Sequence, residues 1–206
     1  MIYGPVTVSA VYKAGVGCLI ATATYGSELT PQVSFLRNFR DQRIMESNAG
    51  KSFMHAFNAW YYSFSPTVAG YVAGSPAART AVKAFLYPLF GILEASAATY
   101  HALSFSPELS ITLTGILAAS LIGLVYDAPL AVFAQYHVWR RWRFTLKLRH
   151  LKPLFYVWAS SLIGIGLAEA LKWAMLMSVS TATLVLSSMV GSALLASTLL
   201  FRRVCR

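Results

Sequence analysis

An acid and a histidine, Glu94 and His101, lie seven residues apart within one apolar stretch of this chain. Seven residues are close to two turns of an α-helix, so both side chains fall on one helix face. An ionisable residue at membrane depth is a candidate for function, and this pair could relay a proton or contribute to a metal site. We favour a structural alternative, in which Glu94 packs against a partner helix and His101 lies at the membrane interface.

Asp127 is the second candidate, because Pro129 follows it closely. Proline bends a helix and leaves a backbone carbonyl without its usual donor, which makes room for a polar partner near Asp127. A path for ions could use Glu94 and Asp127 together. We favour a structural pairing for Asp127 as well.

Cys18 is the third candidate, since a thiol can act as a nucleophile. Catalysis would require a base, and the nearest histidine, His55, could reach the thiol only through folding. We favour a buried structural thiol. The other cysteine, Cys205, lies far along the chain, and two cysteines give no metal-ligand spacing. We therefore expect no catalytic residue, cofactor or metal in this chain.

The composition indicates that these residues belong to a membrane protein. Hydrophobic residues make up 57% of the 206 residues and charged residues only 12%, with a mean hydropathy of +0.58. A soluble core could not bury this much apolar surface, so a bilayer is the expected solvent. The net charge of +10 could suggest nucleic acid. The basic residues flank apolar runs, however, as they do in membrane proteins, so we expect no nucleic acid partner.

Four apolar segments are long enough to cross a bilayer, which takes about 20 helical residues. We therefore expect an all-α fold, a polytopic membrane protein with about four transmembrane helices after a small amphipathic helical region. The chain would be a multi-pass protein of the cell membrane, in contact with lipid. The segments lie within a membrane region at 81–206 and occupy about residues 85–103, 109–138, 153–171 and 173–201.

A basic loop between the second and third segments orients these helices. Six of the seventeen Lys and Arg residues lie in it, and no acid. Positive residues beside membrane helices stay in the cytoplasm, which predicts both termini inside and residues 104–108 outside. Residues 1–83 carry seven basic and three acidic side chains, so we expect them inside too. The loop residues are Arg140, Arg141, Arg143, Lys147, Arg149 and Lys152.

Small residues recur about four positions apart in every apolar segment. Lipid provides no hydrophobic drive between helices, so close packing at small residues must hold them together. These faces could pack within the chain or against partner subunits. The candidates are Gly91 and Ala95 in the first segment, Gly115, Ala119 and Gly123 in the second, Ser160, Gly164 and Ala168 in the third, and Ser188 and Ser192 in the fourth.

We expect residues 18–80 to form amphipathic helices at the membrane surface, after an N-terminal arm at residues 1–17. Thr30 and Pro31 suit a helix start, because proline at the first helical position loses no hydrogen bond. The pairs Ser65-Pro66 and Ser75-Pro76 predict two further helix starts.

An aromatic stripe lies within this region, at spacings of four, three and four residues. It forms either the core of a small helical hairpin or a face at the lipid headgroups, because amphipathic rings suit both. Its members are Phe53, Phe57, Trp60 and Phe64.

Residues 18–27 read Cys-Leu-Ile-Ala-Thr-Ala-Thr-Tyr-Gly-Ser. This stretch resembles the Cys-Phe-Ile-Ala-Thr-Ala-x-Tyr-Gly box of a prokaryotic family, the CFI-box C-terminal domain, with Leu19 in place of the usual Phe. The resemblance covers about residues 17–75. It continues through Pro31-Gln32-Val33, the run from Leu36 to Asp41, Gly50 and the run from Tyr61 to Pro66.

The resemblance implies a fold and a membrane setting, since the family has no established catalytic activity. In many relatives the box follows an exported domain, which would place residues 18–80 outside the cell. The form with a long helical membrane tail looks like those of ammonia-oxidising archaea. This similarity implies an accessory subunit of a membrane enzyme such as the copper-dependent ammonia monooxygenase.

Three functions follow as hypotheses. The first is a non-catalytic accessory or structural subunit, which packs in the bilayer against other membrane protein subunits. The second is a small transporter or channel that uses Glu94 and Asp127. The third is a thiol-dependent enzyme that uses Cys18.

Overall fold

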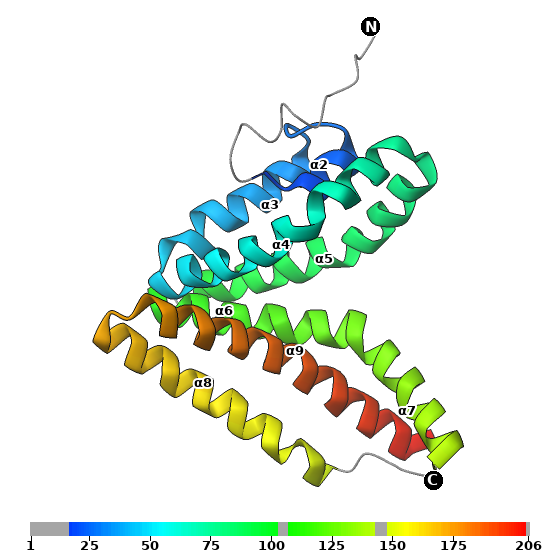
Figure 1. Cartoon of the computed structure of the whole chain (residues 1–206), viewed down its shortest axis with the longest axis vertical. Coiled ribbons are helices and arrows are strands. Elements are labelled where there is room, and N and C mark those ends of the chain that lie inside the picture. Colours follow the sequence, from blue (N-terminus) through cyan, green and yellow to red (C-terminus); the bar gives the residue numbers. More distant parts are fainter. Residues whose placement is uncertain (1–16, 103–106, 143–147, 205–206) are drawn as a thin grey trace, which may run out of the picture.

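The computed structural model describes residues 17–102, 107–142 and 148–204, and these are helical almost throughout (Figure 1). No strand occurs in these three ranges. The predicted all-α class is therefore confirmed. The predicted N-terminal arm lies outside the described residues, apart from Gly17.

The first helices are short, and local signals set their ends. Helix α2 (Leu19–Tyr25) ends at Gly26, whose φ of 84° suits glycine because it has no Cβ. Helix α3 (Pro31–Gln42) begins at the predicted proline. After the short turn η1 (Ile44–Glu46), Ser47 caps helix α4 (Asn48–Gly74), and its Oγ accepts a hydrogen bond of 2.9 Å from the Gly50 N–H.

The predicted helix start at Pro66 is wrong, because α4 continues through it. Proline removes the N–H that would bond the Tyr62 carbonyl, which costs a helix about 3 kcal/mol. Contacts on both sides of Pro66 offset this cost. Tyr61 and Tyr62 bond to the segment around α2, and Val72 is buried after the proline.

Helix α5 (Pro76–Ala102) begins at the second predicted proline, but it is much longer than a short surface helix. It continues into the first apolar segment without a break. The boundary that we expected between residues 80 and 81 therefore falls inside one helix. Only Ser75 separates α4 from α5.

The remaining chain forms three long helical stretches. Helix α6 (Pro107–Ile122) passes through a π-helical turn, η2 (Gly123–Asp127), into α7 (Ala128–Trp142), and a bend is visible there in Figure 1. We expected Pro129 to bend the helix, and the bend lies at this wide turn. In the turn, the Ala128 N–H bonds to the Gly123 carbonyl. The turn η3 (Leu148–Leu151) leads to α8 (Lys152–Leu171), and α9 (Ala174–Val204) completes the chain.

Four helical stretches are long and apolar enough to cross a membrane, as predicted. Their boundaries shift by a few residues from the expected ones, most at the start of the first, which lies nine residues earlier. The four are Pro76–Thr99, Glu108–Arg141, Arg149–Leu171 and Ala174–Phe201.

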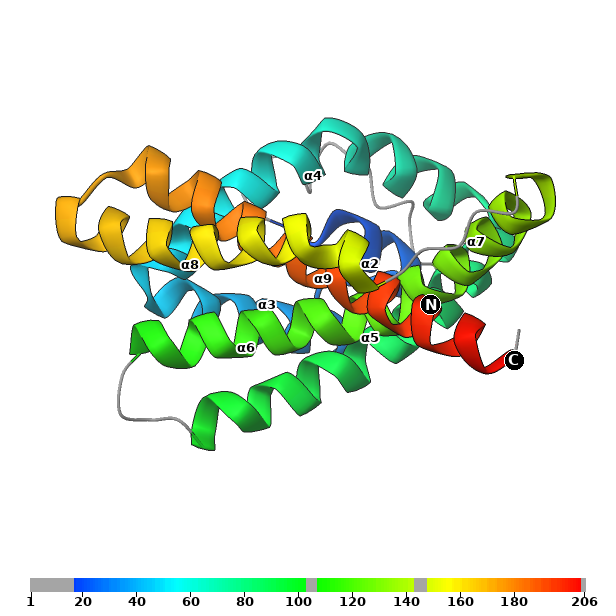
Figure 2. The ribbon, with the colours of Figure 1, turned by 90° about the horizontal axis from the view of Figure 1, so that it is seen from below.

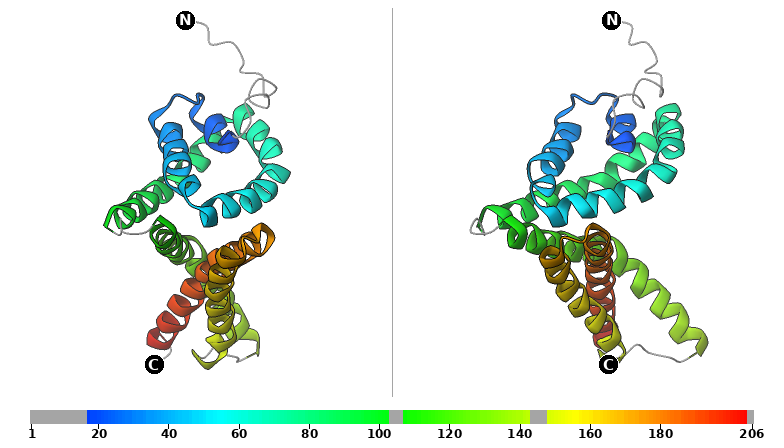
Figure 3. Two further views of the ribbon diagram at one scale, coloured as in Figure 1. Left: turned by 90° about the vertical axis from the view of Figure 1, so that its left-hand side faces the viewer. Right: turned by 60° about the vertical axis from the view of Figure 1, so that its left-hand side comes forward.

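Helix α9 is the central element, because it packs against α4, α6, α7 and α8 (Figures 1 and 2). Helices α2 to α5 are stacked on one side of the group formed by α6 to α9 (Figure 3). The first turn of α4 joins the two groups, since the Asn48 N–H donates to the Glu108 carboxylate at 2.7 Å. The Asn48 side chain also reaches Glu169, at 3.2 Å.

Two of the predicted small residues touch another helix closely. A Cβ on Gly123 would collide with the Met189 carbonyl of α9, and one on Gly164 would collide with the Ser180 hydroxyl. Ser188 accepts a hydrogen bond of 3.0 Å from the Trp158 indole, which ties α9 to α8. Other members of the predicted faces are buried, namely Ala119 and Ala168.

The other small residues lie differently. Gly91, Ala95 and Ser160 are exposed, and a Cβ on Gly91 or on Gly115 would meet nothing within 4 Å. Ser192 lies against Gly123, so it belongs to the contact between η2 and α9.

The glycine contact predicts the effect of one methyl group. Gly123→Ala should lower the stability of the chain by about 1–3 kcal/mol, because rigid backbone of α9 blocks the new Cβ. Gly166→Ala, at an exposed helical site with open space, should raise it by about 0.4–1 kcal/mol. Thermal unfolding in detergent measures both, and equal shifts for the two variants would contradict this packing.

Candidate functional site

A cavity of about 670 Å³ lies between α4 and the helices α5, α6 and α9. Residues of α2 and α3 close it on another side. Its walls are almost entirely apolar. This size lies within the range of about 300–1,000 Å³ typical of small-molecule sites, which are also mostly apolar with a few polar groups.

The wall on α4 is the predicted aromatic stripe. All four of its rings line the cavity, and they also contact one another. The ring centroids of Phe53 and Phe57 lie 5.9 Å apart, and those of Trp60 and Phe64 lie 4.8 Å apart. Trp60 is nonetheless 62% exposed, so the cavity reaches the outside of the chain beside it.

The wall on α6 combines isoleucines with small residues. Gly115, Ala118 and Ala119 line the cavity there, and Gly115 has open space where a side chain would be. Thr114 also lines it and is almost fully buried, and its hydroxyl has no hydrogen-bond partner among the described residues. A buried hydroxyl without a partner is unfavourable, and this one has almost no surface that a molecule in the cavity could reach.

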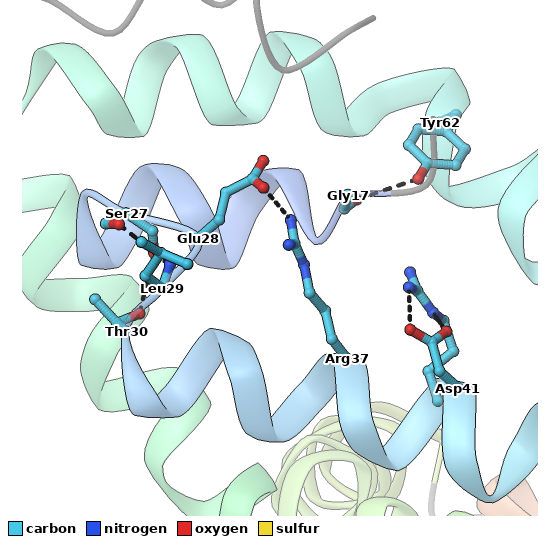
Figure 4. Close-up of polar contacts among 9 residues, drawn as sticks. Gly17, Ser27, Glu28, Leu29, Thr30, Arg37, Asp41 and Tyr62 are labelled. Atoms are coloured by element: carbon cyan, nitrogen blue, oxygen red, sulfur yellow. Dashed lines mark hydrogen bonds and ion pairs between the residues drawn. The ribbon is translucent and has the colours of Figure 1, made fainter. Parts of the chain in front are cut away.

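Two tyrosines of α4 position the start of α2 beside the cavity. The Tyr61 hydroxyl accepts a hydrogen bond of 3.1 Å from the Ile20 N–H. The Tyr62 hydroxyl donates one of 3.1 Å to the Gly17 carbonyl (Figure 4). Burial raises the pKa of Tyr61 to about 12, so this phenol stays neutral. Cys18 lies between these contacts and lines the cavity.

Burial also raises the pKa of the Cys18 thiol, although the positive charges of Arg40 and Arg37 act in the opposite direction. The thiol is therefore protonated at neutral pH and is a weak nucleophile. His55, the base that we considered for it, is exposed on α4, about two turns before Tyr62. These features favour the structural role for Cys18.

Charged residues border the cavity on α3. Arg37 bridges α3 to the preceding loop, with 2.7 Å between its guanidinium and the Glu28 carboxylate, and Arg40 lies 2.6 Å from Asp41 (Figure 4). The Arg40 guanidinium lowers the pKa of Asp41 by its hydrogen bond. Arg40 lines the cavity and is the one charged residue among the described lining residues.

The predicted polar candidates do not meet at this cavity. Glu94 is exposed on α5, and Asp127 is half-buried in η2. His101 lies in the last turn of α5, and its side chain is outside the described part of the chain. Where residues are described, no three His, Cys, Asp or Glu side chains come together as metal ligands would. The cavity can therefore bind an apolar group, and its described residues offer no catalytic base beside the thiol.

The basic loop is described only in part. Arg140 and Arg141 are exposed in the last turn of α7, Arg149 is exposed in η3, and Lys152 is exposed at the start of α8. Arg143 and Lys147 lie outside the described residues. The orientation of the helices that these residues predict stays a prediction. The hydrogen bond between Asn48 and Glu108 puts the start of α4 on the same side as residue 108, so residues 1–83 do not all lie inside if residues 104–108 lie outside.

Sequence reasoning did not find the cavity, although it found pieces of two walls. The aromatic stripe and the small residues Gly115 and Ala119 both stood out, yet we expected Gly115 and Ala119 to touch another helix. Residues of α5 such as Leu86 and Leu89 carried no signal beyond their hydropathy.

No family model, curated protein or solved structure matches this chain. The similarity to the CFI-box family therefore stays a prediction from residues 17–75.

Cys18 provides a test of the cavity's dry interior. In a Cys205→Ser chain, alkylation of Cys18 by iodoacetamide at pH 7 should be at least about tenfold slower than that of free cysteine. Burial raises the thiol pKa, so the rate should rise with pH to a midpoint above 9.0. The same chain unfolded in denaturant should show an ordinary midpoint, and a native midpoint at or below 9 would contradict the burial.

Proposed function

We propose that this chain is a non-catalytic accessory subunit of the cell membrane, held in the bilayer by other membrane protein subunits. Its four helices of membrane-spanning length support the membrane setting. The observation that carries the proposal is an acid on the outer face of one of these helices.

Glu94 is exposed within the span Pro76–Thr99, and no ion pair or hydrogen bond holds its side chain in the described part of the chain. A charged side chain that faces hydrocarbon is costly, so such residues normally face protein and have a partner. Because the described part of this chain does not supply that partner, we infer that a neighbouring subunit does.

The surroundings of Glu94 suit a helix of another subunit. Gly91 and Ala95 flank it and are exposed, and a Cβ on Gly91 would meet no other atom within 4 Å. Small residues let two helix backbones approach closely, and buried polar groups add hydrogen bonds between helices. The predicted small face on α5 is thus available for contact between subunits.

The similarity to the CFI-box family extends this proposal. The family's form in ammonia-oxidising archaea suggests that the complex is a membrane enzyme such as ammonia monooxygenase. In that case this chain supplies packing surface, and another subunit supplies the metal and the chemistry.

The alternative, a transporter that uses Glu94 and Asp127, receives less support. The Tyr126 hydroxyl donates to the Phe85 carbonyl at 2.6 Å, which fixes the η2 turn beside the early part of α5. Phe85 precedes Glu94 by nine residues, about 14 Å along the helix axis. The two acids are therefore at different levels and do not form one site.

Copurification from native membranes tests the proposal. The intact chain should bring down a discrete set of membrane proteins. Glu94→Ala and Gly91→Leu should each reduce their recovery by about tenfold, since the first removes a buried polar contact and the second separates the helices.

The control is Gly166→Leu, which adds the same side chain to an exposed glycine of α8 with equally open space. It should leave recovery unchanged. A wild-type chain that purifies alone, or equal losses for Gly91→Leu and Gly166→Leu, would contradict the proposed interface.

A further inference from the structure

We propose that the cavity between α4, α5, α6 and α9 is a lipid site, which holds one hydrocarbon chain of a glycerolipid from the surrounding bilayer. The inference is independent of the proposed function, because it concerns the inside of the chain and not its outer face. Two observations carry it: the size and lining of the cavity, and its position.

The cavity requires an apolar occupant. Water does not fill it favourably, because its walls offer almost no polar atoms. Without an occupant, these walls would leave a large apolar surface open to the outside, since the cavity is open beside Trp60. The ligand that satisfies both conditions is a flexible hydrocarbon.

The shape of the cavity suits a chain rather than a compact molecule. Its lining on α6 extends from Ile111 to Ile122, about 17 Å along the helix axis, and its lining on α4 extends further. A space of this length matches an acyl chain. Each methylene group that enters it contributes to binding in proportion to the apolar surface buried.

The position of the cavity gives lipid direct access. Three of its walls, α5, α6 and α9, belong to stretches of membrane-spanning length. Phe85 lines the cavity from α5 and is 60% exposed. Trp60 lines it from α4 and is 62% exposed. These residues mark where the cavity opens to the outside, at helices that would be surrounded by lipid.

Native mass spectrometry of the full chain tests the site. The chain is reconstituted in nanodiscs of 1-palmitoyl-2-oleoyl-phosphatidylcholine and released into a mild detergent. Wild type should retain one intact phospholipid per chain. Gly115→Phe, which puts a ring into the cavity from α6, should reduce retention by at least about tenfold. Gly166→Phe, which adds the same ring to an exposed glycine of α8 that does not line the cavity, should leave it unchanged.

The folded state of each variant is checked by circular dichroism and by its elution volume. If Gly115→Phe fails to fold, Ala118→Phe fills the same wall and replaces it. Extraction of the retained molecule separates an intact glycerolipid from a free fatty acid or a detergent. No retained lipid in wild type, a detergent or fatty acid only, or equal retention in the matched variants would overturn the lipid site. Loss of the subunit partners with normal lipid retention would overturn only the proposed function.

Discussion

The close approach of η2 to α9 constrains the membrane half of this chain. At Gly123 the backbone of η2 lies against the Met189 carbonyl, in space that no side chain could share. Helices in lipid gain nothing from hydrophobic association, so contacts this close hold them together. The π turn at this point directs α7 away from the line of α6, and α9 passes between its neighbours as a common partner. The positions of α6 and α9, two walls of the cavity, depend on this contact.

The cavity arises from a contrast between its opposite walls. Helix α4 presents large rings that stack along its own length, whereas the middle of α6 presents glycine and alanine between its isoleucines, and these small residues do not reach across. The hydrogen bonds of Tyr61 and Tyr62 to the start of α2 hold this side of α4 in place. The space between the walls is a consequence of these anchored positions, and the burial of Cys18 follows from the same arrangement.

Helix α5 connects the two proposals, because it uses opposite faces for them. Leu86, Leu89 and Leu93 line the cavity on one face, while Gly91, Glu94 and Ala95 are exposed on the other. A lipid chain inside and a subunit outside would therefore contact the same helix.

The sequence by itself determined the class of protein and most helix ends. Long apolar runs predicted the four membrane-length helices, and the Thr30-Pro31 pair predicted the start of α3. Both signals act through local composition. Tertiary structure decided the rest. Pro66 predicted a break, but contacts of α4 on both sides overrode its local preference. Gly123 and Gly115 are both helical glycines, yet Gly123 touches α9 and Gly115 faces the cavity. Only the relative placement of α4, α6 and α9 distinguishes them, because distance between helices is set by packing partners far apart in the chain.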